Sequence, residues 1–302
     1  MKKKLIAGLL VSAMAVSMMG CSASKAEEAQ AAEGDATEET VEAEDTDTDA
    51  EAEAPAETNA EPVTLNVFAA ASMTETLTEI QEMYKEVAPN VTLVFNFDSS
   101  GTLKTQIQEG ADCDLFISAA QKQMNQLDKD ADLEVNTEEL DYVLEGTRVN
   151  LLENKVVLAV PDGNPKDIES FEDLGTDRLS LLALGNEDVP VGQYSTEILT
   201  NLGILDSLAA EGKITYGSNV KEVTTQVSEA AADAGIIYAT DAFSAGLTVV
   251  DQAEGDLCKQ VIYPAAVLNI SKNPEAAKEF LAYLQTDTCM KVFEAVRFTA
   301  AE

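Results

Sequence analysis

VTLNVFAAASMTETLTEIQEMYKEVAPNVTLVFNF, residues 63–97, contains the pattern on which the whole chain is built. Its first part, 63–69, alternates in polarity and is rich in branched and aromatic residues, which predicts a strand. Residues 72–87 then place apolar side chains at helical spacing, and Ser72 with Glu75 forms the S-x-x-E signature of a capped helix start. A second branched and aromatic run closes the stretch. The order strand, helix, strand is typical of an α/β fold.

The same alternation of strands and helices continues after this stretch to about residue 129. It begins again at Lys155. Turn residues separate the apolar runs, and this spacing predicts parallel strands covered by helices on both faces. The further strands that we predict are 91–97, 115–118, 156–160, 179–184, 235–239, 247–250 and 261–270. The further helices are 102–109, 121–129, 193–202, one that opens at Ser218 and Asn219, and two at the end of the chain.

Two α/β units in succession predict two lobes, each a mostly parallel sheet flanked by helices. Long strands near 156–160 and 261–269 are the natural crossovers between them, and the last helices then return to the first lobe. We therefore expect lobe I to contain residues 62–155 plus 265–302, and lobe II residues 156–264. Ligands of such folds bind in a crevice at the carboxyl ends of strands.

The N-terminus predicts export. Three lysines at 2–4 precede an apolar run, 5–19, that has the length of a signal-peptide core and is too short for a membrane span. Gly20 and Cys21 follow, and this ending resembles the lipobox of bacterial lipoproteins. The resemblance implies a signal peptide, 1–20, and a lipid-anchored Cys21 on a protein that faces outside the cytoplasm. An ordinary secretory signal with an incidental cysteine is the alternative.

Residues 22–61 form a segment of different composition, made mostly of Ala, Glu, Asp and Thr. It carries fifteen acidic residues against one lysine, a net charge of −14. Such a segment cannot bury enough apolar surface to offset its chain entropy, and its charges repel each other. We interpret 21–61 as the lipidated cysteine and a disordered acidic tether; a helix is the alternative, but no apolar stripe exists to pack it.

Composition excludes several functions for the remaining residues, 62–302. With the tether (−14) and the three N-terminal lysines set aside, −25 of the total charge of −36 remains, which argues against binding to nucleic acid or to an anionic membrane surface. The chain has no histidine, so imidazole-based triads are excluded. Without histidine, the three remaining scattered cysteines argue against a zinc or haem site. A single disulfide between Cys258 and Cys289 is one alternative for two of them.

Five short segments at the starts of helices carry the candidate binding chemistry. A helix start has unsatisfied N–H groups and a partial positive charge, so it is suited to hold an anion. Neutral dipoles in a closed cleft bind an oxyanion in spite of the acidic exterior, because excluding water strengthens each bond. The segments are residues 69–72 (AAAS), 98–102 (DSSGT), 189–192 (VPVG), 219–220 (NV) and 238–241 (YATD).

The chain resembles the periplasmic molybdate-binding proteins of ABC importers in four segments, which match in order and spacing. These segments are AAAS, SSGT, DVPVGQY (188–194) and GIIYATDA (235–242). The resemblance covers nearly all of 62–302 and implies a two-lobed class II periplasmic-binding-protein fold with a hinged cleft. It also implies an oxyanion site made of neutral donors, with no protein atom bound directly to the metal. Carried over by motif, the ligand-binding residues are the donors of Ser72 and Ser100, the backbone N–H groups of Val191 and Val220, and the hydroxyl of Tyr238.

Each of these residues also has an ordinary structural interpretation. Taken by itself, Ser72 could serve only as a helix N-cap, and Ser100 could belong to an ordinary turn. Tyr238 by itself could be a half-buried tyrosine bonded to a backbone carbonyl. Val191 and Val220 carry no side-chain signal. We prefer the binding interpretation because the segments occur together and in order. A carboxylate would repel the ligand, so we expect Asp98 to face away and to bond its own loop.

The segments bear on three classes of function. A neutral donor set suits an anion without protons, and a rigid shell favours molybdate or tungstate over the smaller sulfate, which stays the main alternative along with other small anions. Amino-acid and sugar sites need a well-placed arginine or stacked aromatics, which the segments lack. An enzyme using Asp112 with Asp114, or Asp241, lacks a nucleophile–base pair. We expect no enzyme and no cofactor, but a monomeric solute-binding protein that delivers its anion to an ABC permease.

Overall fold

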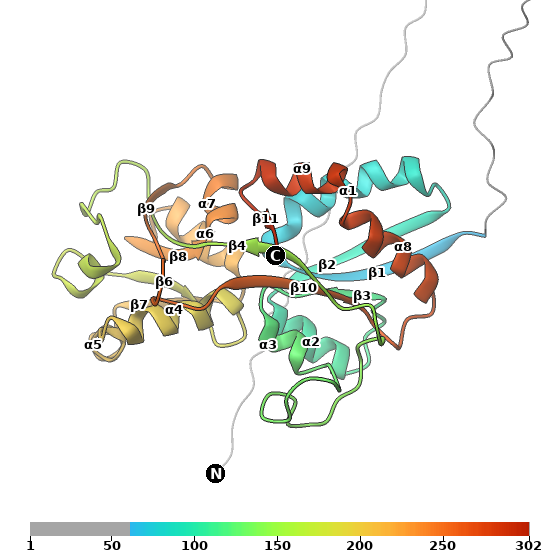
Figure 1. The fold of residues 1–302 in the computed structure, drawn as a ribbon. Coiled ribbons are helices and arrows are strands. Elements are labelled where there is room, and N and C mark those ends of the chain that lie inside the picture. Colours follow the sequence, from blue (N-terminus) through green and yellow to red (C-terminus); the bar gives the residue numbers. More distant parts are fainter. Residues whose placement is uncertain (1–60, 302) are drawn as a thin grey trace, which may run out of the picture. The chain divides into compact units, whose positions relative to one another are not determined.

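The computed structural model describes residues 61–301. The expected signal peptide, the expected lipidation at Cys21 and the expected tether up to residue 60 lie outside the described residues. Within 61–301, two mixed sheets are each flanked by helices (Figure 1). No helix of this part of the chain has the length and apolar character that crossing a bilayer requires.

The first sheet has six strands in the order β11-β4-β10-β3-β1-β2. Strand β1 shows why this region folds as it does, because its side chains alternate between two apolar layers. Leu65 and Val67 belong to one core cluster, whereas Phe68 belongs to the other, which includes Leu103 and Met124. The strands are β1 (Val63–Ala70), β2 (Val91–Asp98), β3 (Leu115–Ile117), β4 (Val149–Asn154), β10 (Val261–Val267) and β11 (Thr299–Ala300).

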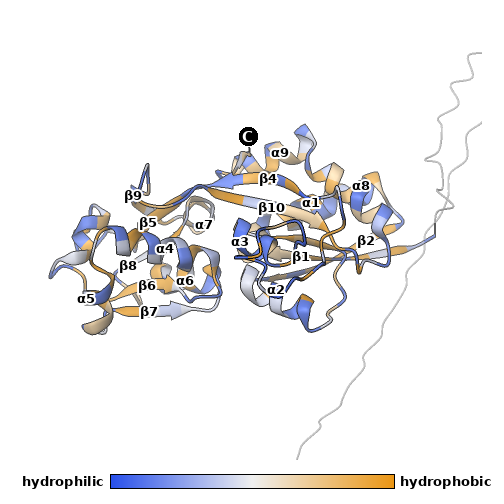
Figure 2. Ribbon diagram, turned by 60° about the horizontal axis from the view of Figure 1, so that its bottom comes forward, coloured by the Kyte–Doolittle hydropathy of each residue, from blue (hydrophilic) through white to orange (hydrophobic). Residues whose placement is uncertain are grey.

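The second sheet has five strands in the order β7-β6-β8-β5-β9. Its central strands are continuous buried runs without alternation, which is typical of strands covered on both faces. Figure 2 shows the same property as hydrophobic colouring of β5, β6 and β10. The strands are β5 (Val156–Val160), β6 (Leu182–Gly185), β7 (Ile214–Gly217), β8 (Ala234–Tyr238) and β9 (Thr248–Gln252).

Helices cover both faces of the two sheets (Figure 1). Beside the first sheet lie the 3-10 turn η1 (Ala71–Met73), α1 (Thr74–Val87), α2 (Ser100–Gln108), α3 (Gln121–Asn125), α8 (Pro274–Leu284) and α9 (Asp287–Ala295). Beside the second sheet lie η2 (Phe171–Gly175), α4 (Pro190–Asn201), α5 (Leu205–Ala210), α6 (Val220–Ser228) and α7 (Ala239–Ser244).

Both sheets are mixed: most strands of each run in one direction, as predicted, and antiparallel strands lie among them. Strand β1 pairs in parallel with β2 and β3, but β10 is antiparallel to β3 and β4. In the second sheet β6 is parallel to β7 and β8, but β5 is antiparallel to β8 and β9. The reason is that the chain changes sheets directly at Lys155 and returns between Gln252 and Val261, without the helical crossover that a parallel connection needs.

Two local predictions fail at Ser72 and at the cysteines. Ser72 lies inside η1, and α1 begins at Thr74 without a side-chain cap, so the S-x-x-E capping prediction was wrong. The hydroxyl of Ser72 has another partner, described below. Cys258 and Cys289 are free thiols in the described part of the chain, so the alternative of a bridge between them is wrong as well.

Candidate functional site

Four of the five predicted binding residues line one small cavity. Ser72, Ser100, Val220 and Tyr238 surround it, although they come from four different elements. Val191 does not line it. This residue is fully buried in the first turn of α4, directly after Pro190, which does contact the cavity. The structure therefore brings together sequence segments that are up to 166 residues apart, from Ser72 to Tyr238.

The first sheet contributes two buried serine hydroxyls. Ser72 follows the end of β1 and is 4% exposed, and Ser100 begins α2 and is fully buried. Ser100 is not the cap of its helix, because Ser99 takes that role by accepting a hydrogen bond from Thr102 N at 3.1 Å. The Oγ of Ser100 accepts a hydrogen bond from Ala119 N at 2.9 Å instead. Its own proton is thus free to point into the cavity.

The second sheet contributes a helix start and a phenol. Val220 is the first residue of α6, whose cap is Asn219, and the side chain of Asn219 accepts from Glu222 N at 3.1 Å. Tyr238 ends β8, and its hydroxyl donates to Ala119 O over 3.5 Å. Burial, with Tyr263 nearby, raises the pKa of Tyr238 well above its usual value, so this group remains a neutral donor.

Residues beside the cavity hold the two sheets' loops together. Gly101 N donates to Asp188 O at 3.0 Å, which joins the start of α2 to the loop before α4. A Cβ on Gly101 would lie 2.4 Å from that same oxygen, so this approach requires glycine. The Nζ of Lys221 on α6 meets Glu75 on α1 at 2.7 Å. These contacts join segments of the two sheets next to the residues that line the cavity.

A buried polar network that sequence reasoning missed stands behind Ser72. The Oγ of Ser72 lies 2.8 Å from the hydroxyl of Tyr263 on β10. The Nδ2 of Asn154, the last residue of β4, donates to Tyr263 at 3.2 Å and to Thr240 Oγ1 at 3.0 Å. Asn154 and Tyr263 are 2% and 0% exposed. Neither residue stands out in the sequence, because each looks like part of an ordinary strand.

Asp241 is the buried carboxylate of the site region. Burial raises its pKa to about 6, although Lys221 opposes the shift. Lys221 Nζ lies 3.1 Å from Oδ1 of Asp241, as an ion pair without well-aligned hydrogen-bond geometry, since that oxygen has no hydrogen-bond partner among the described residues. Burial lowers the pKa of Lys221, but Asp241 and Glu75 raise it by more, so the lysine stays charged.

The lining of the cavity is nearly neutral. None of the three arginines and no lysine belongs to it, and Asp98 is its one charged residue among those described. Oδ1 of Asp98 accepts from Ser99 N at 2.7 Å, so Asp98 does bond its own loop as predicted. Asp98 as a residue also borders the cavity, so the direction of its second carboxylate oxygen stays a prediction. Hydroxyl and N–H donors around so small a space can hold a small anion without a cation.

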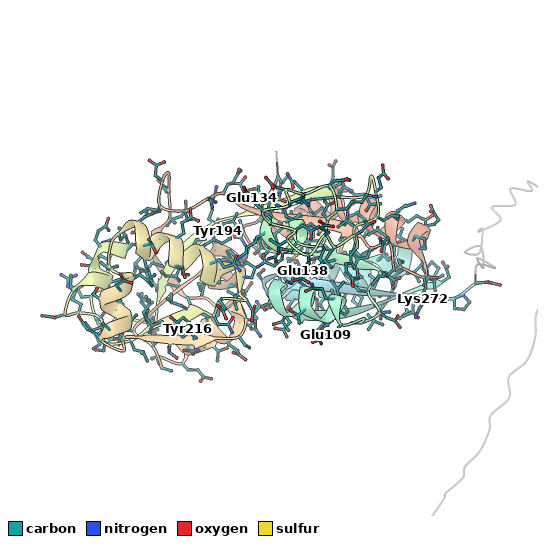
Figure 3. All side chains as sticks on the ribbon, turned by 90° about the horizontal axis from the view of Figure 1, so that it is seen from below. Glu109, Glu134, Glu138, Tyr194, Tyr216 and Lys272 are labelled. Carbon is teal, nitrogen blue, oxygen red and sulfur yellow. The ribbon has the colours of Figure 1, made fainter. Side chains whose placement is uncertain are left out.

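Larger grooves have a different character. One of about 540 Å³ is lined by Gln121 and Lys122 of α3, by Tyr194 of α4, which is labelled in Figure 3, and by exposed charged residues. Another of about 270 Å³ lies beside the ion pair of Lys272, also labelled there, with Asp112. Neither gathers several buried hydroxyls, so the small cavity is the candidate site.

Known proteins resemble this chain over most of the described residues. The family model for bacterial extracellular solute-binding proteins matches residues 65–296. A Bacillus subtilis (strain 168) protein provisionally described as an ABC transporter substrate-binding lipoprotein, YvgL, is 38% identical over 79% of this chain and 87% of its own length. The molybdate-binding protein ModA of Haemophilus influenzae is 34% identical over 78% of this chain and 90% of its own length.

A solved structure shows the same fold. The periplasmic molybdate-binding protein of Azotobacter vinelandii superposes with a TM-score of 0.68, covering 79% of this chain and all of its own. The two sequences are 22% identical in that comparison, so the likeness concerns the fold alone. It confirms the predicted two-sheet periplasmic-binding-protein architecture.

Proposed function

Because the chain belongs to the bacterial extracellular solute-binding protein family, we propose that it captures molybdate, or the nearly isosteric tungstate, and delivers it to the permease of an ABC importer. One observation carries the proposal: two buried serine hydroxyls, a phenol and a helix start meet around a cavity that no cationic side chain lines. The names of the relatives, a substrate-binding lipoprotein and a molybdate-binding protein, support it.

The donors have distinct roles in this proposal. The hydroxyls of Ser72 and Ser100 donate to the oxyanion's oxygens, and Tyr238 joins them when its proton turns from Ala119 O to the anion. The backbone N–H of Val220 and, from just outside the cavity lining, that of Val191 complete the shell from the starts of α6 and α4. Because these donors are neutral and preorganised, binding needs no charge neutralisation, and water exclusion strengthens each bond. Metal and protein do not touch, and the protein performs no catalysis and needs no cofactor.

The rest of the molecule serves delivery. Lobe I, 62–155 plus 265–302, and lobe II, 156–264, each surround one sheet, with β10 crossing the second boundary. They close on the anion by hinge motion, and the closed monomer docks on the permease. A diacylglycerol on Cys21 and the acidic tether keep the exported domain near that permease and raise its effective concentration there.

Isothermal titration tests the proposal. The chain lacking residues 1–21 and stripped of anions is titrated separately with molybdate, tungstate, sulfate and phosphate. We expect one-to-one binding of the first two, with sulfate far weaker, because fixed donors leave gaps around a smaller tetrahedron. Heat from sulfate alone would assign the chain to sulfate capture. The absence of heat from all four anions would reject an oxyanion ligand.

A further inference from the structure

We propose that Asn154 and Tyr263 are positioning residues that hold the Ser72 hydroxyl as a donor, so that the cavity favours an oxyanion without protons. The inference rests on the proposed function and adds to it the source of the site's selectivity. It follows from the direction of each hydrogen bond in the network behind Ser72. Only the direction of the Tyr263–Ser72 bond is ambiguous from the positions of its two oxygens.

Asn154 sets the direction of the hydrogen bonds in this network, because one backbone N–H group fixes which way its side-chain amide is turned. Lys155 N donates to Oδ1 of Asn154 at 2.8 Å, and an N–H group can be met only by the oxygen of that amide. The nitrogen must therefore face the two hydroxyls. It donates one proton to Thr240 at 3.0 Å and the other to Tyr263 at 3.2 Å.

Tyr263 passes this direction on to Ser72. Its oxygen already accepts from Asn154, so its own proton needs an acceptor, and Ser72 Oγ at 2.8 Å is the one that the described residues provide. Ser72 thereby accepts one proton, and its own proton has no acceptor within the described network. The Ser72 residue lines the cavity, where an oxyanion would receive that proton. Thr240 completes the pattern by donating to Oδ2 of Asp241 at 3.4 Å.

Ser100 reaches the same state by a simpler route. The backbone N–H of Ala119 donates to its Oγ at 2.9 Å, so the proton of Ser100 is also left for the cavity. A backbone N–H group thus leaves Ser100 as a donor toward the cavity, and two side chains, Asn154 and Tyr263, do the same for Ser72. A fully deprotonated oxyanion can accept from both. A protonated oxyanion such as hydrogen phosphate carries one oxygen that is itself a donor. Where that oxygen faces a serine held as a donor, the two protons conflict, whereas a hydroxyl that is free to turn could accept instead.

Asn154, Tyr263 and Ser72 form a hydrogen-bond relay, which packs closely against its neighbours where the chain passes between the sheets. The ring of Tyr263 lies 5.8 Å from that of Tyr238 and 5.2 Å from that of Phe298, both in edge-on contacts. Asn154 ends β4, one residue before the chain enters the second sheet, and it pairs with Val261 at the start of β10. Replacing Tyr263 with phenylalanine would keep the ring contacts and remove only the hydroxyl.

A double-mutant cycle on molybdate binding tests the relay. It compares the unmodified chain with Ser72→Ala, Tyr263→Phe and the double variant, all measured by titration, and uses Tyr84→Phe as a control for loss of a buried tyrosine hydroxyl on α1. We expect Tyr263→Phe to weaken binding about tenfold and Tyr84→Phe to change it by less than about twofold. The double variant should bind no more weakly than Ser72→Ala, because Tyr263 acts only through Ser72.

Two further measurements separate positioning from a structural role. Tyr263→Phe should narrow the preference for molybdate over hydrogen phosphate, because Ser72 is then free to accept. Asn154→Asp retains the acceptor for Lys155 N but attracts the proton of Tyr263, so Ser72 must donate to Tyr263 instead of to the ligand. This variant should lose at least as much affinity as Tyr263→Phe, and it decides the matter if the latter does not fold.

The outcomes distinguish the relay from the function on which it rests. If the unmodified chain binds none of the four anions, both ideas fail. If it binds molybdate but the losses from Ser72→Ala and Tyr263→Phe simply add, or if Asn154→Asp binds normally, the relay alone is rejected. Non-additive losses together with the narrowed preference would establish it.

Discussion

Ser100 and Ser99 are neighbours with the same side chain, and the structure gives them different tasks. Ser99 caps α2, whereas Ser100 turns its hydroxyl to the cavity and to Ala119 N. A single residue step around the start of a helix therefore separates a purely structural serine from a candidate ligand residue. This difference can be tested directly, because the two roles have different consequences when each hydroxyl is removed.

Ser100→Ala should weaken molybdate binding by about 1–3 kcal/mol, since a buried donor to the anion is lost and Ala119 N loses its acceptor. Ser99→Ala is the matched control. It should lower the free energy of unfolding by about 1 kcal/mol through loss of the cap, with little change in affinity. Titration and denaturant unfolding of both variants check this. Equal effects on affinity would contradict the assignment of Ser100.

Asp241 predicts a pH dependence of stability. Its pKa is raised to about 6 in the folded state by burial, so between pH 4 and 6 the folded chain binds more protons than the unfolded chain. The contribution of Asp241 to stability is therefore greatest at low pH and falls as the pH rises through this window. The groups that face it are Lys221, Glu75, Thr240 and Tyr263.

The Asp241→Asn variant isolates this effect, because asparagine does not titrate. The free energy of unfolding of the unmodified chain, relative to Asp241→Asn, should fall by roughly 1–3 kcal/mol between pH 4 and 7. Urea unfolding of both proteins across this range measures the difference. A difference that does not change with pH would mean that Asp241 titrates at its ordinary pKa.

At the scale of elements, the site depends on how closely the start of α2 approaches the loop before α4. Gly101 makes that approach through a backbone hydrogen bond to Asp188. The neighbouring pair of Lys221 with Glu75 joins α6 to α1 across the same cavity. An ion pair at this partly exposed position contributes little by itself, so we attribute the close fit mainly to the backbone contact.

Gly101→Ala tests the close approach of these two segments. Within the helix itself alanine is favoured over glycine by about 1 kcal/mol. Its Cβ would meet Asp188 O at 2.4 Å, however, so the two loops must move apart and molybdate affinity should fall about tenfold or more. Gly146→Ala is the opposite control. Gly146 has φ +77° and no atoms near its added Cβ, so stability should fall and affinity should not.

At the scale of the whole molecule, the protein is acidic and its proposed ligand is a dianion. The chain carries a net charge of −36, whereas the cavity lining is almost neutral. Repulsion by the exterior acts on the approaching anion over roughly a Debye length, while the bound anion is held by short contacts. The rate of association should therefore respond to salt more strongly than the rate of dissociation.

Raising the ionic strength from about 0.01 M to about 0.3 M should increase the association rate of molybdate roughly two- to tenfold. The dissociation rate should stay nearly constant. Stopped-flow measurement of tyrosine fluorescence can follow both, since the chain has seven tyrosines and no tryptophan. Association that slows with salt would indicate that a local positive field outweighs the acidic exterior.

Much of the architecture could be predicted from the sequence because periodicity is a local property. The alternation in 63–69 gave β1, and the helical spacing after it gave α1, with boundaries that differ by one or two residues. The binding segments were found for a related reason. Each lies where an apolar run ends and a helix begins, and the order of such junctions along the chain is readable without coordinates.

Only the tertiary structure decided which hydroxyl groups are hydrogen-bonded to each other. Ser72 looked like a helix cap, yet its partner is Tyr263, 191 residues away. Asn154 and Tyr263 gave no signal, because a polar residue at a strand end and a tyrosine in an apolar strand are both ordinary. The direction of the strands around Lys155 was equally hidden. Composition and spacing determine which elements form and where helix starts follow strand ends. Hydrogen-bond direction and sheet pairing depend instead on contacts between residues distant in sequence, which only the folded chain brings together.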